Sequence, residues 1–179
     1  MEKLNILPLD IEKDIPEIKS WEKTFLNHPG YQNIKHFILE DNIYYGLDEV
    51  ILTNYEFFHI GEDEKKYCFS IKNENNETVG FILACVFNIA RCKPEIILQY
   101  IVLNPNYQNH GYGTYILKEL VSNSNNYFGC KPKNIYANIE KENTASLNLF
   151  KKFGFSFSLA PMGYIRANKT IQNLEKDNY

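Results

Sequence analysis

Two glycines in a short polar stretch are the residues of this sequence best suited to bind an anion. The stretch reads Gln108-Asn109-His110-Gly111-Tyr112-Gly113-Thr114, and a helical pattern follows it. Gly111 and Gly113 permit positive φ and let the backbone approach a ligand without an intervening Cβ. The first-turn amides of a helix have no backbone partner, and the helix dipole adds positive potential there. A strand, a glycine loop and a helix start therefore predict an anion site.

The loop matches neither of two common phosphate-binding fingerprints. It lacks the Gly-Lys-Ser/Thr of a Walker A loop, and it lacks the three-glycine spacing and later acidic residue of a dinucleotide-binding motif. Two glycines alone are equally well explained by a tight turn. The order Gln-x-x-Gly-x-Gly, three residues after Pro105 ends an apolar run, makes the binding interpretation more specific.

At these residues the chain resembles the GNAT superfamily of acetyl-CoA-dependent N-acetyltransferases. The family pattern is a strand, Pro, two residues, Gln or Arg, two residues, Gly, one residue, then Gly or Ala. Pro105, Gln108, Gly111 and Gly113 meet it. A second family block runs from Asn143 to Phe155 as NTASLNLFKKFGF, after a strand-like segment. The two blocks, in the usual order, cover residues 95–158.

The resemblance implies a mixed α/β (α+β) GNAT fold. Its centre is a mostly antiparallel sheet of six to seven strands with a splayed parallel pair, flanked by helices. We expect one domain over residues 1–170 and a tail over 171–179. The sequence itself predicts strands at 3–9, 67–71, 79–87, 96–103, 134–140, 155–158 and 164–168. Helices are predicted near 10–26, at 31–40, after Thr114 and after Asn143.

Several local signals position these elements. The run 96–103 is almost continuously apolar, which predicts a strand buried on both faces. Polar residues 73–78 predict a hairpin turn, and polar residues 122–126 predict the end of the helix that follows the glycine loop. Asn143 is a good helix cap, and Gly154 can supply a left-handed helix end.

The first helix has two candidate caps. Asp10 or Asp14 can cap it, with Pro16 tolerated in its first turn. The aromatic residues of 41–61 show no clean period, so they either fill a core or line an acceptor pocket. Acidic residues of 41–64 would suit a cationic amine as acceptor, although runs of charged residues are more often a solvated face.

Composition excludes several classes of protein. The 179 residues are 44 % hydrophobic and 15 % aromatic, as in a globular domain, and the net charge of -3 has the wrong sign for a nucleic-acid partner. No apolar run reaches the roughly 18 residues of a membrane span, and the start lacks a signal-peptide pattern. We expect a cytoplasmic protein without a membrane partner. Four scattered cysteines and four histidines lack ligand spacing, so no metal site is predicted.

The resemblance implies that acetyl-CoA is the co-substrate and lies between the strands at 96–103 and 134–140. Its pantetheine arm would pair with strand backbone, and its pyrophosphate would lie on the loop amides. His110 is the loop's only basic side chain, so backbone amides are expected to provide most of the phosphate binding. The residues implied to bind the coenzyme are Ile101, Val102, Leu103, Gln108, Asn109, His110, Gly111, Tyr112, Gly113, Thr114, Asn138, Asn143, Ser146 and Phe150.

The usual acid and base of the family are replaced here. The tyrosine expected seven residues after Asn143 is Phe150, and the usual carboxylate positions hold Ile97, Gln99 and Asn138. General acid–base help is worth roughly 10² to 10⁴ in rate, whereas orientation of two bound reactants reaches effective molarities of about 10⁵ to 10⁸ M. Direct attack by a well-placed neutral amine is therefore sufficient without a dedicated acid.

The candidate catalytic residues lie on or near the central strand. Gln99 can hold a water, Glu95 shares its strand parity as a distant proton acceptor, and Tyr100 is the third candidate. Glu140 and Tyr164 are further candidates. For each of these residues the alternative is ordinary polarity at the edge or end of a sheet.

The function expected from these observations is transfer of an acetyl group from acetyl-CoA to a primary amine. The amine would belong to a small molecule or to a peptide or protein N-terminus. A non-catalytic acyl-CoA-binding regulatory module is the alternative, because the family's tyrosine and carboxylates are missing. A peptide-binding scaffold without coenzyme affinity is the third interpretation. Homodimers are common in the family, so a homodimer is left open.

Overall fold

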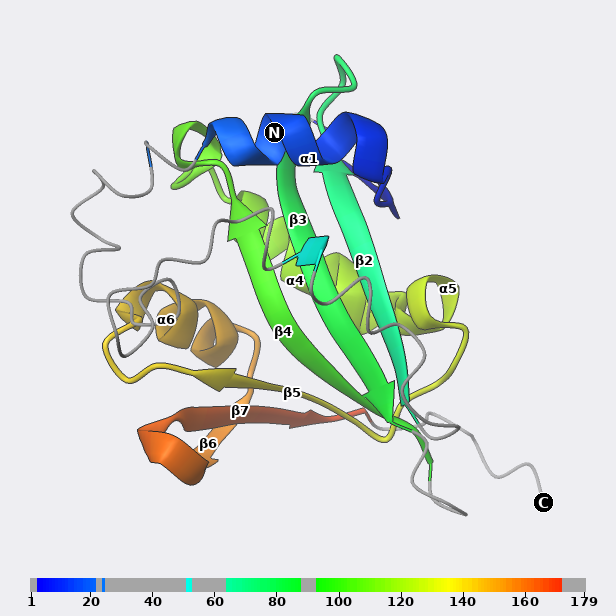
Figure 1. Cartoon of the computed structure of the whole chain (residues 1–179). Helices are drawn as coiled ribbons and strands as arrows, with labels where there is room; N and C mark the ends of the chain where they lie inside the picture. The colour runs from blue at the N-terminus through cyan, green and yellow to red at the C-terminus, as the bar shows by residue number, and fades with distance from the viewer. Residues whose placement is uncertain (1–2, 22–23, 25–50, 53–63, 88–92, 172–179) are drawn as a thin grey trace.

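A seven-stranded mixed sheet organises the chain, which the computed structural model describes over residues 3–21, 24, 51–52, 64–87 and 93–171. Its strand order is β1-β2-β3-β4-β5-β7-β6, and the β4–β5 pair is parallel while the other neighbours are antiparallel (Figure 1). The strands are β1 Asn5–Pro8, β2 Glu64–Lys72, β3 Thr78–Phe87, β4 Glu95–Leu103, β5 Asn134–Ile139, β6 Ser156–Leu159 and β7 Ile165–Thr170. The helices are α1 Ile11–Ser20, α4 Tyr112–Ser122, α5 Ser124–Phe128 and α6 Thr144–Lys152, with 3₁₀ turns η2 Pro105–Tyr107 and η3 Pro161–Gly163.

This architecture confirms the predicted fold class. The sheet is mostly antiparallel, it contains the expected parallel pair, and helices flank it. The predicted helix at 31–40, most of the aromatic stretch 41–61 and all but the first residue of the predicted tail 171–179 lie outside the described residues. No helix in the described part of the chain is long and apolar enough to cross a membrane.

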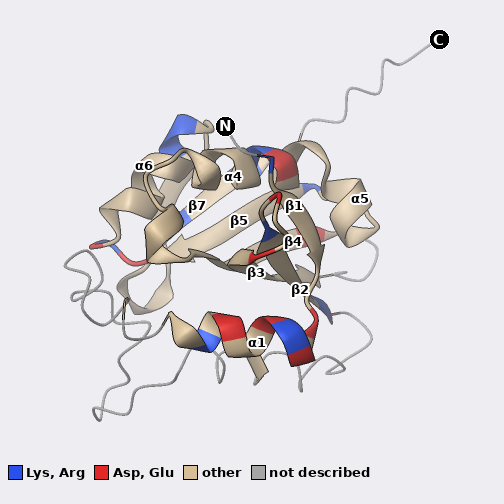
Figure 2. Ribbon diagram, turned by 90° about the horizontal axis from the view of Figure 1, so that it is seen from above, with Lys and Arg blue, Asp and Glu red and all other residues tan. Residues whose placement is uncertain are grey.

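The two faces of the sheet are covered by different helices. Helices α4, α5 and α6 lie on one face and α1 lies on the other (Figure 2). Each face has its own buried cluster. The α4 face packs residues such as Ile82, Ile96 and Leu117, and the α1 face packs Ile18, Phe81 and Leu83. Alternate residues of β3 therefore serve opposite cores, as the two-residue period of a strand requires.

The strand buried on both faces is β3, not β4 as predicted. Nine of the ten β3 residues are buried, whereas β4 alternates and Gln99 is exposed. The apolar run 96–103 misled the prediction because β4 pairs with β5 over only part of its length. Its open part borders the site described below.

Asp10 is the N-cap of helix α1, and its side chain accepts a hydrogen bond from the Lys13 amide at 3.3 Å. Pro16 is therefore the sixth helical residue, and its predicted place in the first turn is wrong. A proline at this position removes the bond to the carbonyl of residue 12. Asp14, the other candidate cap, is fully buried and binds Lys72 and Thr78.

The helix after the glycine loop ends at Ser122, as the polar residues indicated, but a second short helix follows. Helix α5 runs from Ser124 to Phe128 and ends at Gly129 in the left-handed conformation. Residues 122–126 were expected only to end a helix, because their polar composition hides the buried Phe128 that anchors α5.

Candidate active site

The parallel strands β4 and β5 form a V that opens toward their carboxyl ends. They pair only at Glu95–Asn134, Ile96–Ile135 and Ile97–Tyr136. Beyond these pairs the two strands diverge (Figure 1). Parallel strands that separate leave backbone groups on their facing edges available to a ligand that adds as a strand.

A β-bulge at Gln99 marks the point where the V opens. Leu83 of β3 pairs with Tyr100, and the next residue, Ala84, pairs with Leu98, so Gln99 is the extra residue. One extra residue reverses the alternation of the strand. Leu98 accordingly packs on the α4 face, whereas Tyr100 packs on the α1 face.

Beyond the bulge, one edge of β4 faces the opening. The Asn104 amide donates to Val79 of β3 at 2.9 Å. Because amides of a strand alternate in direction, those of Ile101 and Leu103 point away from β3. The Leu103 carbonyl on this edge accepts a hydrogen bond from Gln108 Nε2 at 3.0 Å. Gln108 thus ties the glycine loop to the end of β4.

The glycine loop presents the start of α4 in a form suited to an anion. Gly111 is the N-cap residue with φ 83°, and Asn109 also has a positive φ of 62°. Within the described part of the chain no side chain caps this helix, and its first turn contains no acidic residue. The amides of Gly113 and Thr114 belong to the first turn of α4, where backbone amides have no partner within the helix. They combine with the helix dipole to favour a negative charge.

Aromatic side chains within and next to the glycine loop pack against one another. Tyr112 is buried, and its ring lies 6.0 Å from the His110 ring and 6.3 Å from the Tyr107 ring, centre to centre. A Cβ added at Gly113 would lie 3.5 Å from Leu149 Cδ2, so the start of α4 passes close to α6.

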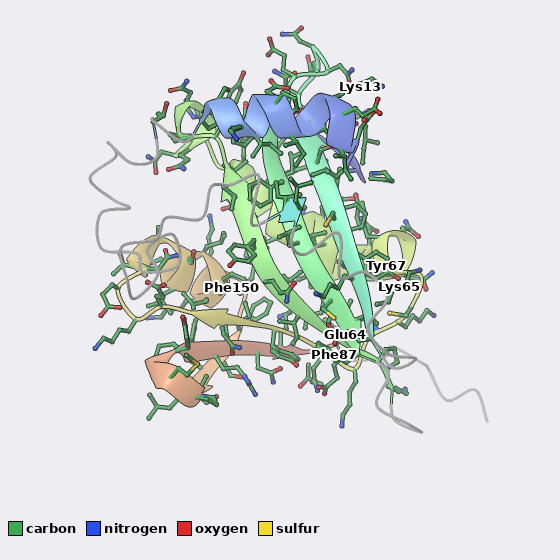
Figure 3. All side chains as sticks on the ribbon, viewed as in Figure 1. Lys13, Glu64, Lys65, Tyr67, Phe87 and Phe150 are labelled. Carbon is green, nitrogen blue, oxygen red and sulfur yellow. The ribbon has the colours of Figure 1, made fainter. Side chains whose placement is uncertain are left out.

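Helix α6 supplies the other wall. Asn143 caps it as predicted, because its side-chain oxygen accepts from the Ser146 amide at 3.1 Å. Gly154 adopts the predicted left-handed conformation just after the helix, with φ 71°. Phe150 is only 5 % exposed and packs edge-on against Phe155, with ring centres 4.9 Å apart. Figure 3 shows Phe150 on α6 in relation to the strands.

Comparison with known families identifies the chain. The model of the Acetyltransferase (GNAT) family matches residues 31–155, which include β4, the glycine loop, β5 and α6. The chain belongs to the GNAT acetyltransferase family. It is therefore an acyltransferase, and acetyl-CoA is its co-substrate.

Solved GNAT structures share this fold at low sequence identity. A Vibrio cholerae spermidine N-acetyltransferase in complex with CoA and spermine is 15 % identical, with a TM-score of 0.62 over 93 % of this chain and 95 % of that one. An acetyltransferase from Thermus thermophilus is 15 % identical, with a TM-score of 0.65 over 96 % and 100 %. The NatC complex bound to Gag peptide and CoA contains a chain that is 16 % identical, with a TM-score of 0.61 over 96 % of this chain and 100 % of that one. The search of curated proteins found no match.

The GNAT site fits acetyl-CoA at both of its binding elements. The uncapped start of α4 suits the pyrophosphate, and the outward edge of β4 suits the amide groups of the pantetheine arm. Asn143 and Ser146, which the resemblance implies as coenzyme contacts, lie at the start of α6. Asn138 lies on the face of the sheet opposite α4, α5 and α6, because its neighbours Ala137 and Ile139 pack in the cluster on the α4 face. Its Oδ1 accepts a hydrogen bond from Arg166 Nε at 3.1 Å. Its proposed coenzyme contact remains a prediction.

The three candidate catalytic residues of the GNAT domain lie at different places. Glu95 is at the closed end of the V, where it accepts a hydrogen bond from Asn134 Nδ2 at 2.7 Å. Gln99 occupies the exposed bulge. Tyr100 lies just beyond it on the α1 face, and burial, with help from Tyr164 and Glu140, raises the pKa of its phenol. Only Gln99 and Tyr100 are thus at the opening.

Two further residues at the opening stand out. The β5–β7 ladder pairs Ile139 with Ile165, so its next step places Glu140 opposite Tyr164. Burial, and then the charge of Glu140, raises the pKa of Tyr164. Arg166, which binds Asn138, was not among the predicted site residues. Arg166 pairs with Asn138 in the β5–β7 ladder, and directly paired residues share a face of the sheet. That register is the signal that places Arg166 on the same face as Asn138.

Proposed function

We propose that this GNAT protein transfers an acetyl group from acetyl-CoA to a primary amine by direct nucleophilic attack. The observation that supports it is that two features occur in one place. Helix α4 starts at Gly111 without a side-chain cap among the described residues, and the edge of β4 beyond Ile97 is not paired with β5. Both binding elements for the thioester are then on one side of the V, and the α1 face at the opening is left for the acceptor.

The chemistry requires little from side chains. A thioester carbonyl accepts the lone pair of a neutral amine: the N–C bond forms, the C–S bond breaks, the amine nitrogen loses a proton and the thiolate gains one. The chain supplies orientation, which is worth more than acid–base help. A phenol has an ordinary pKa near 10, and burial raises the pKa of Tyr100 and Tyr164 further, so both are protonated at neutral pH and their hydroxyls can donate hydrogen bonds.

A second candidate is favoured by one observation. Phe150 occupies the position of the family's tyrosine, and its ring has no proton to give to a leaving thiolate. A non-catalytic acyl-CoA-binding module would retain the coenzyme site and lack this proton donor. The two functions make the same prediction for coenzyme binding and opposite predictions for turnover.

The test has two steps. Calorimetry with acetyl-CoA comes first, and no binding at millimolar coenzyme would contradict both functions. Release of free thiol from acetyl-CoA is then measured with a panel of amines. The panel contains polyamines and peptides with free N-termini, because the Vibrio enzyme was crystallised with spermine and NatC with a peptide. Turnover with any amine supports the transferase, and binding without turnover across the panel supports the module.

A further inference from the structure

The turn between β2 and β3 contacts the segment that leads into the glycine loop. The turn and the loop lie at the same end of the sheet, because β2 and β4 run in the same direction on either side of β3 (Figure 1). Tyr107 is the last residue of η2, directly before the loop. Its hydroxyl donates a hydrogen bond to Glu77 Oε2 at 3.4 Å and accepts one from Asn73 Nδ2 at 3.5 Å. Residues of a distant hairpin thus contact the entry to the glycine loop.

Asn73 is a buried polar residue that organises this turn, and it is only 3 % exposed. Its Oδ1 accepts hydrogen bonds from the amides of Asn75 at 3.0 Å and Glu77 at 2.9 Å. Its Nδ2 donates to Glu77 Oε2 at 2.7 Å, and its own amide donates to the Glu77 carbonyl at 3.1 Å. The carboxylate of Glu77 is therefore held in place, although the residue is exposed.

The turn is anchored to α1 at both of its ends. Lys72 and Thr78 flank it, and both donate hydrogen bonds to the buried carboxylate of Asp14. Lys72 Nζ also donates to the Thr78 hydroxyl at 2.6 Å, and the Thr78 amide donates to Glu17 Oε2 at 3.1 Å. Because these bonds fix the turn from both sides, it can serve as a rigid support for the segment that it contacts.

Tyr107 connects this support to the start of α4. Its ring centre lies 6.3 Å from that of Tyr112, which is buried and is the first residue of α4. The loop between them contains two residues with positive φ, Asn109 and Gly111. A non-glycine residue adopts this conformation at some cost in free energy, so it persists only where surrounding contacts hold it. Contacts at Tyr107 therefore favour the loop conformation that places Gly111 at the start of the helix.

The charge of Glu77 opposes a direct role in binding the coenzyme. A carboxylate repels a pyrophosphate, so its charge alone would weaken binding at the start of α4. Glu77 can aid binding only as a hydrogen-bond acceptor that holds Tyr107. Its charge and its contact therefore have opposite effects on affinity, and substitutions can separate them.

We propose that Glu77, held in place by the buried Asn73, is a positioning residue for acetyl-CoA. It acts through the Tyr107 hydroxyl, which keeps the glycine loop in the conformation that presents the first-turn amides of α4. The inference rests on the proposed coenzyme site and extends its support to the β2–β3 turn. A loop ordered before binding loses less conformational freedom when the coenzyme binds, so the effect falls on affinity and not on the chemical step.

Tyr107→Phe tests the contact, because it removes the hydroxyl and keeps the ring that packs on Tyr112. We expect the dissociation constant of acetyl-CoA, measured by calorimetry, to rise roughly three- to tenfold, as the loss of one hydrogen bond allows. The kcat at saturating acetyl-CoA should change by less than about twofold, because only binding is affected. An unchanged dissociation constant would overturn the inference.

Tyr67→Phe is the matched control. It removes a hydroxyl that donates to the Phe128 carbonyl at 2.7 Å, from the first half of β2 and away from the turn. Urea unfolding should show that this variant is destabilised, whereas its dissociation constant for acetyl-CoA should equal that of the wild type. If both tyrosine variants weaken binding equally, the effect is a general loss of stability and the positioning role is wrong.

Two Glu77 variants separate the hydrogen bond from the charge. Glu77→Gln keeps an acceptor oxygen and removes the charge, so its affinity should equal or exceed that of the wild type. Glu77→Ala removes both and should weaken binding. Combined with Tyr107→Phe, Glu77→Ala should add no further loss, because both substitutions remove the same contact. Additive losses would show that the two side chains act independently, which contradicts the inference.

Gly111→Asp distinguishes a failure of the inference from a failure of the proposed coenzyme site, because it alters that site directly. If Gly111→Asp weakens binding and Tyr107→Phe does not, the site at the start of α4 stands and the positioning role fails. If neither substitution changes the affinity, acetyl-CoA binds elsewhere, and the proposed site and the inference fail together.

Discussion

At the scale of single residues, Gly111 and Gly129 share a left-handed backbone conformation but lie at opposite ends of their helices. Gly111 has φ 83° at the start of α4, and Gly129 has φ 65° at the end of α5. A Cβ at Gly129 would have no heavy atom within 4 Å. A side chain at either position strains the backbone by about 1 to 2 kcal/mol. Only the one at Gly111 would stand against the proposed phosphate site.

Gly111→Asp is therefore expected to weaken acetyl-CoA binding by at least about tenfold, because it adds a side chain and a negative charge beside the helix start. Gly129→Asp is the matched control, with a similar loss of stability and an unchanged dissociation constant. Calorimetry measures both affinities, and urea unfolding measures both stabilities. Equal affinities for the two variants would remove the glycine loop from the coenzyme site.

Phe150→Tyr tests how much the missing acid matters. The ring is buried against Phe155, so an added hydroxyl should cost about 1 to 3 kcal/mol of stability unless it finds a partner. If orientation carries the reaction, kcat should rise by less than tenfold. A rise of roughly 10² to 10⁴ would show instead that proton donation limits the wild-type enzyme. Steady-state kinetics with the best amine of the panel distinguishes the two outcomes.

At the scale of elements, α1 is tied to the sheet by a polar contact as well as an apolar one. Asp14 accepts hydrogen bonds from Lys72 Nζ and from the Thr78 hydroxyl, and the Thr78 contact is 3.0 Å long. The Asp10 amide donates to its other oxygen at 2.8 Å. Burial alone would raise the pKa of Asp14, but the bonds from Lys72 and Asp10 outweigh it and lower the pKa.

Asp14→Asn should destabilise the protein by roughly 3 to 5 kcal/mol at pH 7, because Lys72 loses its buried counter-charge. The pKa of Asp14 is lower in the folded state than in the unfolded one. Its contribution is therefore fully present above the unfolded value near 4, and it is lost as the pH falls through the folded value. Urea unfolding at pH 7, 5, 4 and 3 should show the wild-type advantage constant at first and shrinking only below about pH 4.

Asp10→Asn is the control for that series. It makes the same substitution four residues earlier, where the carboxylate is exposed, caps α1 and pairs with Lys13. Asparagine caps helices as well as aspartate does, so little change is expected. A loss at Asp10 as large as that at Asp14 would contradict the assignment of stability to the buried contact.

The elements that could be predicted from sequence are those whose signals are local. Pro105, the Asn143 cap, the Gly154 helix end and the polar hairpin at 73–78 each act within a few residues, and each is confirmed. The bulge at Gln99 could not be predicted, because it depends on which β3 residues oppose β4. That one residue decides the face of Tyr100. The meeting of Tyr100, Glu140 and Tyr164 depends in turn on the insertion of β7 beside β5.

At the scale of the whole molecule, the sheet consists of two parts with a narrow junction. Strands β1 to β4 form one antiparallel part, and β5, β7 and β6 form the other. Three residue pairs between β4 and β5 join them. The proposed coenzyme site takes the β4 edge and the start of α4 from one side and the start of α6 from the other. A ligand that contacts both sides should therefore stabilise the junction between β4 and β5 as well as the residues that it touches.

Hydrogen exchange measures where that stabilisation lies. With acetyl-CoA at about 100 times its dissociation constant, groups covered by the ligand should exchange about 100-fold more slowly, because they exchange only from the free form. We expect this protection at the amides of Ile101, Leu103 and Tyr112 to Thr114. The amides of β6 are the internal control: the strand lies at the far edge of the sheet with exposed residues, so its rapid local exchange should not change. Unchanged rates at residues 112–114 under saturating acetyl-CoA would mean that the thioester does not bind at the start of α4, and the proposed orientation of both substrates would be wrong.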